Sequence, residues 1–140
     1  MQHTLTIPMR AIGKQRPRVY GHRAVTPPET KAAEARIAAE WMAARLPMVE
    51  GPVALHIDAV YAMPTSWPVK RKIAALGAPM ESARQCDCDN ALKLCLDALN
   101  GVAYPDDRHV TEASVAQVWG QYDSLTITVS AIPVREAAHA

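Results

Sequence analysis

The chain has 140 residues, the length of one domain, and its 49% hydrophobic and 21% charged residues argue against disorder and coiled coils. Lys and Arg total 15 and Asp and Glu total 14, so the net charge of +1 by itself indicates no polyanionic partner. The sequence has neither the roughly 20 consecutive apolar residues that span a bilayer nor a secretory signal at its start. We expect one domain over residues 1–134, a short tail at 135–140, and a cytoplasmic protein without a membrane segment.

The N-terminal part is expected to form a short strand, a basic loop and a long helix. Alternating residues predict a strand over residues 4–7. Residues 10–23 carry five basic and no acidic side chains, and their glycines and proline favour a loop or loose hairpin at 18–25. Thr26 is expected to be the N-cap of a helix that starts at the two following prolines and runs to about Leu46.

The middle of the chain contains the clearest strand. Apolar side chains occupy every second position over residues 53–63, and His56 and Asp58 lie on the opposite, polar face, where we expect a structural role. A second basic cluster at 70–72 leads into one or two helical turns at 73–79.

The C-terminal part predicts one further helix and two strands. Helical spacing of apolar residues covers 91–101, where Asn100 and Gly101 end the helix. Residues 109–119 and 124–132 are expected to be strands joined by a hairpin turn. The predicted fold class is therefore α+β: two layers, with a mixed sheet of about four to five strands and two main helices.

Polar groups crowd residues 87–107 around the predicted helix. If the chain is extended from Asp87 to Asp89, their carboxylates lie on one side, about 6.6 Å apart along the backbone, and can share one or two hard cations. Lys93 is one helical turn beyond Asp89, on the same face. Aspartates with a neighbouring lysine suit metal-assisted phosphodiester cleavage, in which the ion activates water and the lysine offsets developing charge.

Asp107 can join this group in two ways. A helix of about 11 residues carries the chain some 16 Å from Asp89, while the seven residues from Gly101 to Asp107 can cover at most about 23 Å, so a return within one chain is feasible. A two-fold dimer can instead supply part of each site from the second chain. The sequence leaves both arrangements open.

Each acidic residue also has a structural interpretation. Asp89 can serve as a helix N-cap, and Asp89, Lys93 and Asp97 can form a solvated ion-pair ladder worth a few tenths of a kcal/mol per pair. Asp106 and Asp107 can simply end a turn. The D-x-D pattern alone is not specific, and the joint pattern carries the metal hypothesis.

Three blocks of the sequence resemble one family. DCDNALKLCLDALNGVAYPDD is similar to the signature of RusA-type Holliday-junction resolvases, in which D-x-D-N, a lysine, D-A-L-N-G and a closing D-D follow in that order. GKQRPR resembles the basic N-terminal motif of phage-borne members, and PTSWPVKRKIAALGAP resembles their P-x-S-W segment. Together the blocks cover most of residues 13–110.

The resemblance implies a role for each matching position. It assigns metal binding to Asp87, Asp89 and Asp107 and a catalytic role to Lys93, with Asn90 and Asp106 as supporting residues. Cys86, Cys88 and Pro105 lie outside the family pattern.

The resemblance also implies an activity and an assembly. It implies an intertwined α+β homodimer that depends on Mg²⁺, with Mn²⁺ as a substitute, and that acts as a crossover junction endodeoxyribonuclease making paired symmetric nicks in four-way DNA. Two equivalent cuts in a nearly two-fold junction suit a two-fold dimer with two equivalent sites.

The basic residues are the predicted DNA contacts, with a solvated basic surface as the alternative. A recognition-helix pattern is missing, so we expect junction shape to matter more than base readout. The predicted contacts are Lys14, Arg16, Arg18, Arg23, Lys70, Arg71 and Lys72.

Two rival functions stay open. One is a metal-dependent hydrolase of another phosphate ester, and the other is a junction-binding protein without useful turnover. A zinc site from Cys86, Cys88, Cys95 and His109 is disfavoured, because C-x-C lacks the usual ligand gap and Cys95 lies on the apolar stripe of the helix.

The three tryptophans have structural interpretations. Trp67 can wedge into a junction, but a buried anchor for its loop is the favoured interpretation. Trp41 and Trp119 are assigned to core or dimer packing.

Overall fold

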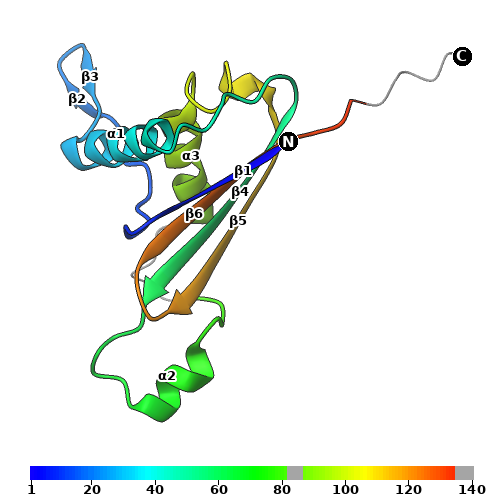
Figure 1. The fold of residues 1–140 in the computed structure, drawn as a ribbon. Helices are drawn as coiled ribbons and strands as arrows, with labels where there is room; N and C mark the ends of the chain where they lie inside the picture. The colour runs from blue at the N-terminus through cyan, green and yellow to red at the C-terminus, as the bar shows by residue number, and fades with distance from the viewer. Residues whose placement is uncertain (82–86, 135–140) are drawn as a thin grey trace, which may run out of the picture.

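The computed structural model describes residues 1–81 and 87–134, so the predicted tail at 135–140 and Cys86 lie outside the described residues. It is a mixed α+β fold, as predicted (Figure 1). The elements in chain order are β1 (Gln2–Ile7), β2 (Arg18–Tyr20), β3 (Arg23–Val25), α1 (Pro28–Ala43), β4 (Val53–Ala62), α2 (Val69–Ala75), α3 (Cys88–Leu99), the 3₁₀ turn η1 (Asp107–His109), β5 (Val110–Gly120) and β6 (Ser124–Ala131).

The main sheet has four strands in the order β1-β6-β4-β5. β5 runs parallel to β4, whereas β6 is antiparallel to both β1 and β4, which makes the sheet mixed as predicted. The short hairpin β2–β3 forms a separate two-stranded sheet in the expected place.

The predicted hairpin between the last two strands is wrong, because β4 lies between β5 and β6. The turn after β5 crosses the end of β4 instead. There the carboxylate of Asp123 accepts a hydrogen bond from the Ala62 N–H at 2.8 Å, and the Gly120 carbonyl accepts one from the Met63 N–H at 3.0 Å. The polar groups of this turn therefore complete β4 rather than join two adjacent strands.

The hydrophobic core lies between one face of this sheet and the helices α1 and α3 (Figure 1). β4 alternates strictly, with Ile57 and Tyr61 among its buried residues. α1 contributes Ile37 and Trp41, which are 0% and 1% exposed. On the opposite face of the sheet His56 contacts Asp58 at 3.0 Å, which supports the structural role expected for that pair.

α1 differs from the prediction at both ends. Its N-cap is Pro27, no side chain caps it, and Pro28 is the first helical residue, so the predicted N-cap at Thr26 is wrong. Prolines start a helix without a side-chain acceptor because a proline nitrogen has no N–H to satisfy. The helix ends at Ala43, before the predicted end near Leu46, and Arg45 with φ 54° turns the chain away from the helix axis.

α2 begins directly after Pro68, earlier than the predicted turns at 73–79, because the fixed φ of proline favours helix initiation at the next residue. The second basic cluster is therefore part of the helix. α2 projects beyond one end of the sheet, whereas the β2–β3 hairpin projects at the other end of the molecule (Figure 1).

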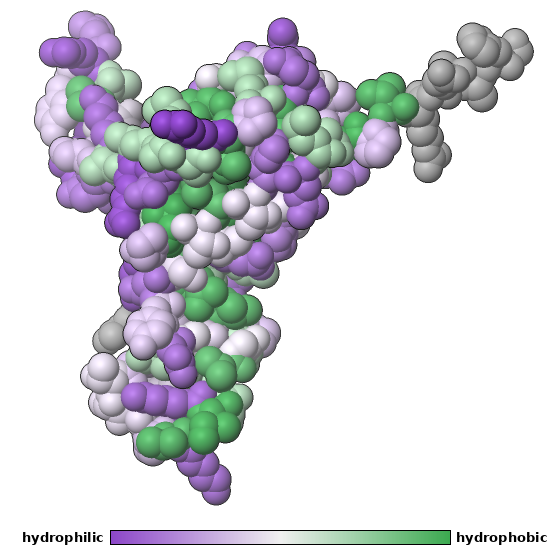
Figure 2. Space-filling model, in the orientation of Figure 1, coloured by the Kyte–Doolittle hydropathy of each residue, from purple (hydrophilic) through white to green (hydrophobic). Residues whose placement is uncertain are grey.

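Hydrophobic side chains gather over the α2 end of the molecule (Figure 2). Val69, Ile73 and Leu76 are 72%, 73% and 56% exposed there. Within residues 1–81 and 87–134, no helix has the length and apolar character needed to cross a membrane.

Candidate active site

Asp87 and Asp89, the first two aspartates of the predicted site, lie at the start of α3. Asp87 is the N-cap with extended backbone (φ −65°, ψ 141°), and Asp89 is already in the first helical turn, so the expected extended geometry through Asp89 is wrong. Asp89 is therefore not the N-cap, and the Asp87 side chain makes no capping hydrogen bond. Both carboxylates are exposed, and Asp87 accepts a hydrogen bond from the Asn90 amide at 3.5 Å.

The basic N-terminal segment crosses α3 at this point. The Lys14 N–H donates to the Asn90 carbonyl at 3.0 Å, which fixes the segment against the first turns of the helix. Between them lies a hollow of about 430 Å³. It is lined by Lys14, Gln15, Arg16, Pro17, Asp87, Asp89, Asn90 and Lys93, so the fold unites six of the residues predicted for catalysis, support and DNA binding.

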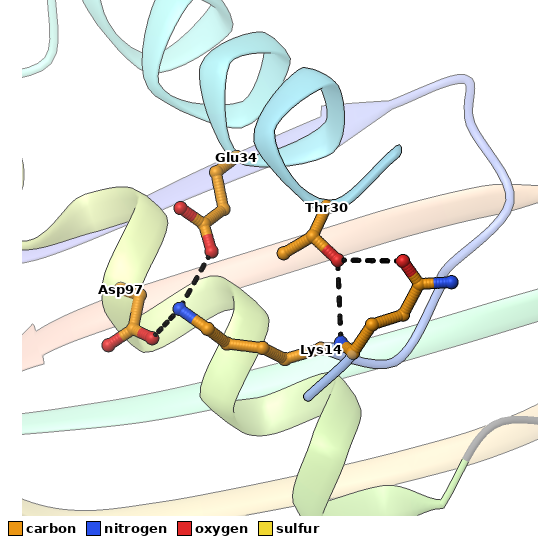
Figure 3. A network of polar contacts seen from close by, with 5 residues as sticks. Lys14, Thr30, Glu34 and Asp97 are labelled. Carbon is orange, nitrogen blue, oxygen red and sulfur yellow. Dashed lines mark hydrogen bonds and ion pairs between the residues drawn. The ribbon is translucent and has the colours of Figure 1, made fainter. Parts of the chain in front are cut away.

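Lys14 is held between two helices (Figure 3). Its ammonium group forms ion pairs with Glu34 of α1 at 3.0 Å and with Asp97 of α3. Burial lowers the pKa of Lys14, but its contacts with the two carboxylates outweigh that effect and raise the pKa overall. The predicted DNA contact of Lys14 stays a prediction, and in the structure its charge already has two acidic partners.

The neighbouring Gln15 adds contacts to the same crossing through Thr30, which Figure 3 labels. Its backbone N–H donates to the Thr30 hydroxyl at 3.4 Å, and that hydroxyl donates to the Gln15 side-chain oxygen at 3.3 Å. Thr30 is fully buried at the start of α1. The basic segment is therefore bound to both helices rather than loose on the surface.

Asp106 and Asp107 lie near the opposite end of α3. The Asp106 carboxylate accepts a hydrogen bond from the Arg108 N–H at 2.9 Å, which lowers its pKa. A hydrogen bond with Asp106 raises the pKa of Asp107, and the charge of Asp97 adds to the shift. Asp107 therefore lies near Asp97. Asp97 is about two helical turns beyond Asp89, or about 12 Å along the axis of α3.

The structure does not unite the three predicted metal-binding aspartates within one chain. Over residues 1–81 and 87–134, no three His, Cys, Asp or Glu side chains lie close enough together to hold one ion. Asp107 is also absent from the lining of the hollow that contains Asp87 and Asp89. The alternative in which a second chain supplies Asp107 stays a prediction.

Neither described cysteine favours a zinc site. Cys95 is 1% exposed among the core residues, as expected for a small hydrophobic side chain. The Cys88 sulfur accepts a hydrogen bond from the Gln117 amide at 3.3 Å. Cys86 lies outside the described residues.

The remaining predicted DNA contacts lie on the two projecting elements. Arg18 and Arg23 are exposed on the hairpin, and Lys70 and Arg71 are exposed on α2. Lys72, also on α2, is half-buried.

Trp67 is held between two side chains. The Arg71 guanidinium lies 3.8 Å from the Trp67 ring centroid, and Trp67 also packs on Trp119 with ring centroids 5.0 Å apart. These contacts support the anchor interpretation of Trp67.

Sequence reasoning missed the acidic partners of Lys14. The spacing of four residues from Lys93 places Asp97 on the same face of α3, but that spacing predicted only a ladder within the helix. Glu34 gave no local signal, because its contact depends on how α1 packs against α3. Arg10 gives no signal in the sequence beyond its place in the basic segment, and in the structure its guanidinium lies 5.2 Å from the Tyr61 ring centroid.

One comparison with known proteins decides the family. A family model described as endodeoxyribonuclease RusA matches residues 8–130, a range that includes the whole lining of the hollow and Asp107. The chain belongs to the RusA endodeoxyribonuclease family. A search of curated proteins found no match. Membership makes this chain a nuclease-family protein and confirms the resemblance of its three sequence blocks.

Proposed function

We propose that this protein is a Mg²⁺-dependent endonuclease that recognises four-way DNA junctions and resolves them by paired symmetric nicks. The observation that carries the proposal is the hollow at the start of α3, where two exposed carboxylates meet Lys93 and the basic N-terminal segment. A RusA-family match over the same residues supports it.

The donor set suits Mg²⁺. Asp87 and Asp89 are exposed carboxylates without a capping role, and the Asn90 side chain adds an amide oxygen. Mg²⁺ typically takes one or two carboxylates and completes its shell with water and substrate phosphate oxygens. When bound, the ion would polarise the scissile phosphate and lower the pKa of a water nucleophile.

Lys93 and Arg16 would act on the substrate from the walls of the same hollow. Lys93 is one helical turn beyond Asp89, so its ammonium can offset negative charge that develops on the phosphate in the transition state. Arg16 belongs to the segment fixed across α3, and its planar guanidinium can hold a phosphate oxygen pair in one orientation. The chain thus supplies positioning and charge, the main requirements of phosphate-ester cleavage.

The arrangement of the basic elements favours an extended substrate over a small phosphate ester. α3 lies between the β2–β3 hairpin and α2 (Figure 1), and both projecting elements carry exposed basic residues. A DNA arm that passes the acidic hollow could therefore meet positive charge on both sides. Phosphate contacts of this kind give affinity without base readout.

The decisive experiment compares Asp87→Asn with Asp58→Asn on a synthetic four-way junction. Asp58 is a half-buried acid on the face of the sheet opposite the helices, so its variant controls for the loss of one negative charge. We expect Asp87→Asn to bind the junction in EDTA but to lose nicking in Mg²⁺ by at least about 100-fold, because an amide is a poor ligand for a hard cation. Asp58→Asn should cleave like the wild type.

Other outcomes would contradict the proposal in distinct ways. Unchanged junction products from Asp87→Asn would point to a binding protein whose acids serve only the fold. Faster cleavage of linear duplex or of a small phosphate ester than of the junction would point to a different hydrolase. Equal cleavage in Mg²⁺ and in EDTA would show that the reaction does not require a divalent metal ion.

A further inference from the structure

A second hollow, of about 650 Å³, lies where β4 and β5 end. Its lining includes two arginines from distant parts of the sequence, Arg10 and Arg71, together with Trp67, Trp119 and one acid, Glu81. The positive charges therefore outnumber the negative ones in this hollow. Of these residues, only Arg71 is among the DNA contacts predicted from the sequence.

Aromatic rings hold both guanidinium groups in place. Arg10 lies 5.2 Å from the centroid of the buried Tyr61 ring, and Arg71 lies 3.8 Å from the centroid of the Trp67 ring. Stacking of this kind engages the face of a guanidinium and leaves its N–H edge free for an anion. Within residues 1–81 and 87–134, neither arginine forms an ion pair with a carboxylate. This differs from Lys14, whose charge has two acidic partners.

The wall of the hollow is built on paired backbone. The Gly77 N–H donates to the Trp119 carbonyl at 2.9 Å, the Trp119 N–H donates to the Ala78 carbonyl at 3.0 Å, and the Met80 N–H donates to the Gln117 carbonyl at 2.9 Å. Residues 77–80 thus extend the sheet along β5. This pairing fixes the backbone of Trp119 in the wall of the hollow.

A chain of contacts joins the hollow to the start of α3. The Tyr61 hydroxyl under Arg10 donates to the side-chain oxygen of Gln117, and the Gln117 amide donates to the Cys88 sulfur at 3.3 Å. Cys88 is the residue between Asp87 and Asp89. Two hydrogen bonds therefore link the side chain under Arg10 to the first turn of α3, where Asp87 and Asp89 lie.

We propose that the arginine hollow binds a nucleotide of the cleaved DNA strand, next to the scissile phosphate, with Arg10 and Arg71 on its phosphate. This inference rests on the proposed function, because it assumes that the acidic hollow cuts DNA. Two guanidinium edges match the oxygen pairs of a phosphodiester, and the tryptophan surfaces suit the sugar or base of the same nucleotide. The site would hold the strand in register for cleavage.

The test measures DNA binding by the full-length chain in EDTA, so that no cleavage occurs. The variants are Arg10→Gln and Arg71→Gln, and the matched control is Arg45→Gln, an exposed arginine after α1. Each of the two variants should weaken junction binding and lower the slope of log K against log salt by about one, as expected for one lost phosphate contact. Arg45→Gln should keep the wild-type slope, and circular dichroism should show that all three variants are folded.

Tryptophan fluorescence locates the contact. The chain has three tryptophans, and Trp67 and Trp119 line the hollow whereas Trp41 is in the core. A short single-stranded oligonucleotide should quench the fluorescence of the wild type and of Arg45→Gln, but not that of Arg10→Gln. Arg10→Lys keeps the charge without the planar edge, so it should restore the salt slope but only part of the affinity.

The inference and the proposed function fail in different ways. If Arg10→Gln and Arg71→Gln bind and quench like the wild type while Asp87→Asn loses cleavage, the inference is wrong and the proposed function stands. If inorganic phosphate or a mononucleotide saturates the quenching and DNA does not compete, the hollow is a small-anion site and the inference is overturned. If Asp87→Asn cleaves normally, the proposed function fails first.

Discussion

The Tyr104 hydroxyl closes the C-terminal end of α3. It donates to the Leu96 carbonyl at 2.7 Å. The Asn100 N–H, which in a continuing helix would donate to that carbonyl, donates to the backbone carbonyl of Asp97 instead. Helix ends leave such carbonyls without an intrahelical donor. Tyr104→Phe should therefore lower the free energy of unfolding by about 1 to 2 kcal/mol, measured by urea denaturation at neutral pH. Tyr122→Phe, at a side chain that is 78% exposed, is the control and should change little.

The same residue gives the stability a pH dependence. Burial raises the pKa of Tyr104 above its ordinary 10.0, and the charge of Asp107 adds to the effect. Above pH 10.0 the unfolded chain releases this proton more readily than the folded one, so the wild type loses stability as the pH rises. The stability difference between the wild type and Tyr104→Phe should be full below that pH and shrink above it. A difference that stays constant would contradict the role of the neutral hydroxyl.

Individual site residues were predictable where the signal was local. Asp87, Asp89 and Lys93 fall within two helical turns, so spacing alone places them together, and the structure confirms that they line one hollow. The partners of Lys14 could not be found in this way. Its contact with Glu34 requires α1 and α3 to pack side by side, and no periodicity in either helix reports on that packing.

At the scale of elements, the contacts of Lys14 and Gln15 fix the basic segment before the hairpin against α1 and α3. The ammonium group bridges α1 and α3 through Glu34 and Asp97. We predict that this bridge positions the segment that carries Arg16. Asp97→Asn and Lys14→Met should then each slow single-turnover cleavage by about 10-fold to 100-fold, because small misplacements near a reacting phosphate are costly. The double variant should be little slower than either single variant.

Binding measurements in EDTA separate this role from a direct phosphate contact. If Lys14 binds DNA, Asp97→Asn removes one of the two carboxylates that compete for its ammonium group and tightens junction binding. If Lys14 positions the segment, Asp97→Asn leaves affinity the same or weaker. Glu112→Gln, at an exposed acid on β5, is the charge-matched control. Tighter junction binding by Asp97→Asn, with unchanged binding by Glu112→Gln, would overturn the positioning role of Lys14.

Strand order was the part of the fold that local pattern could not give. The alternation over β4 identifies the buried face of that strand, and the structure confirms the strand. The alternation over β6 is satisfied by any neighbour that presents the same face, so it does not distinguish a hairpin with β5 from a pairing with β4. The start of α1 at its two prolines is confirmed, but the cap at Thr26 is wrong, since prolines can begin a helix without a side-chain cap.

The whole molecule places its acidic hollow between two basic projections, but it leaves Asp107 apart from that hollow. Since no three acidic side chains come together in the described part of one chain, we expect a second chain in a two-fold dimer to supply the third carboxylate. The alternative is that Asp107 returns to its own chain's site when metal and DNA bind. The two arrangements can be separated by mixing chains with different defects.

Co-expression of Asp89→Asn chains with Asp107→Asn chains provides this test. If each site takes Asp89 from one chain and Asp107 from the other, a mixed dimer has one fully defective site and one intact site. Random pairing makes half of the dimers mixed, so roughly a quarter of wild-type nicking should return, as single nicks rather than paired ones. Co-expression of Asp87→Asn with Asp89→Asn is the matched control, because the two residues belong to the same half-site and neither arrangement restores it. No recovery in the first mixture, measured on denaturing gels, would place Asp107 in the site of its own chain.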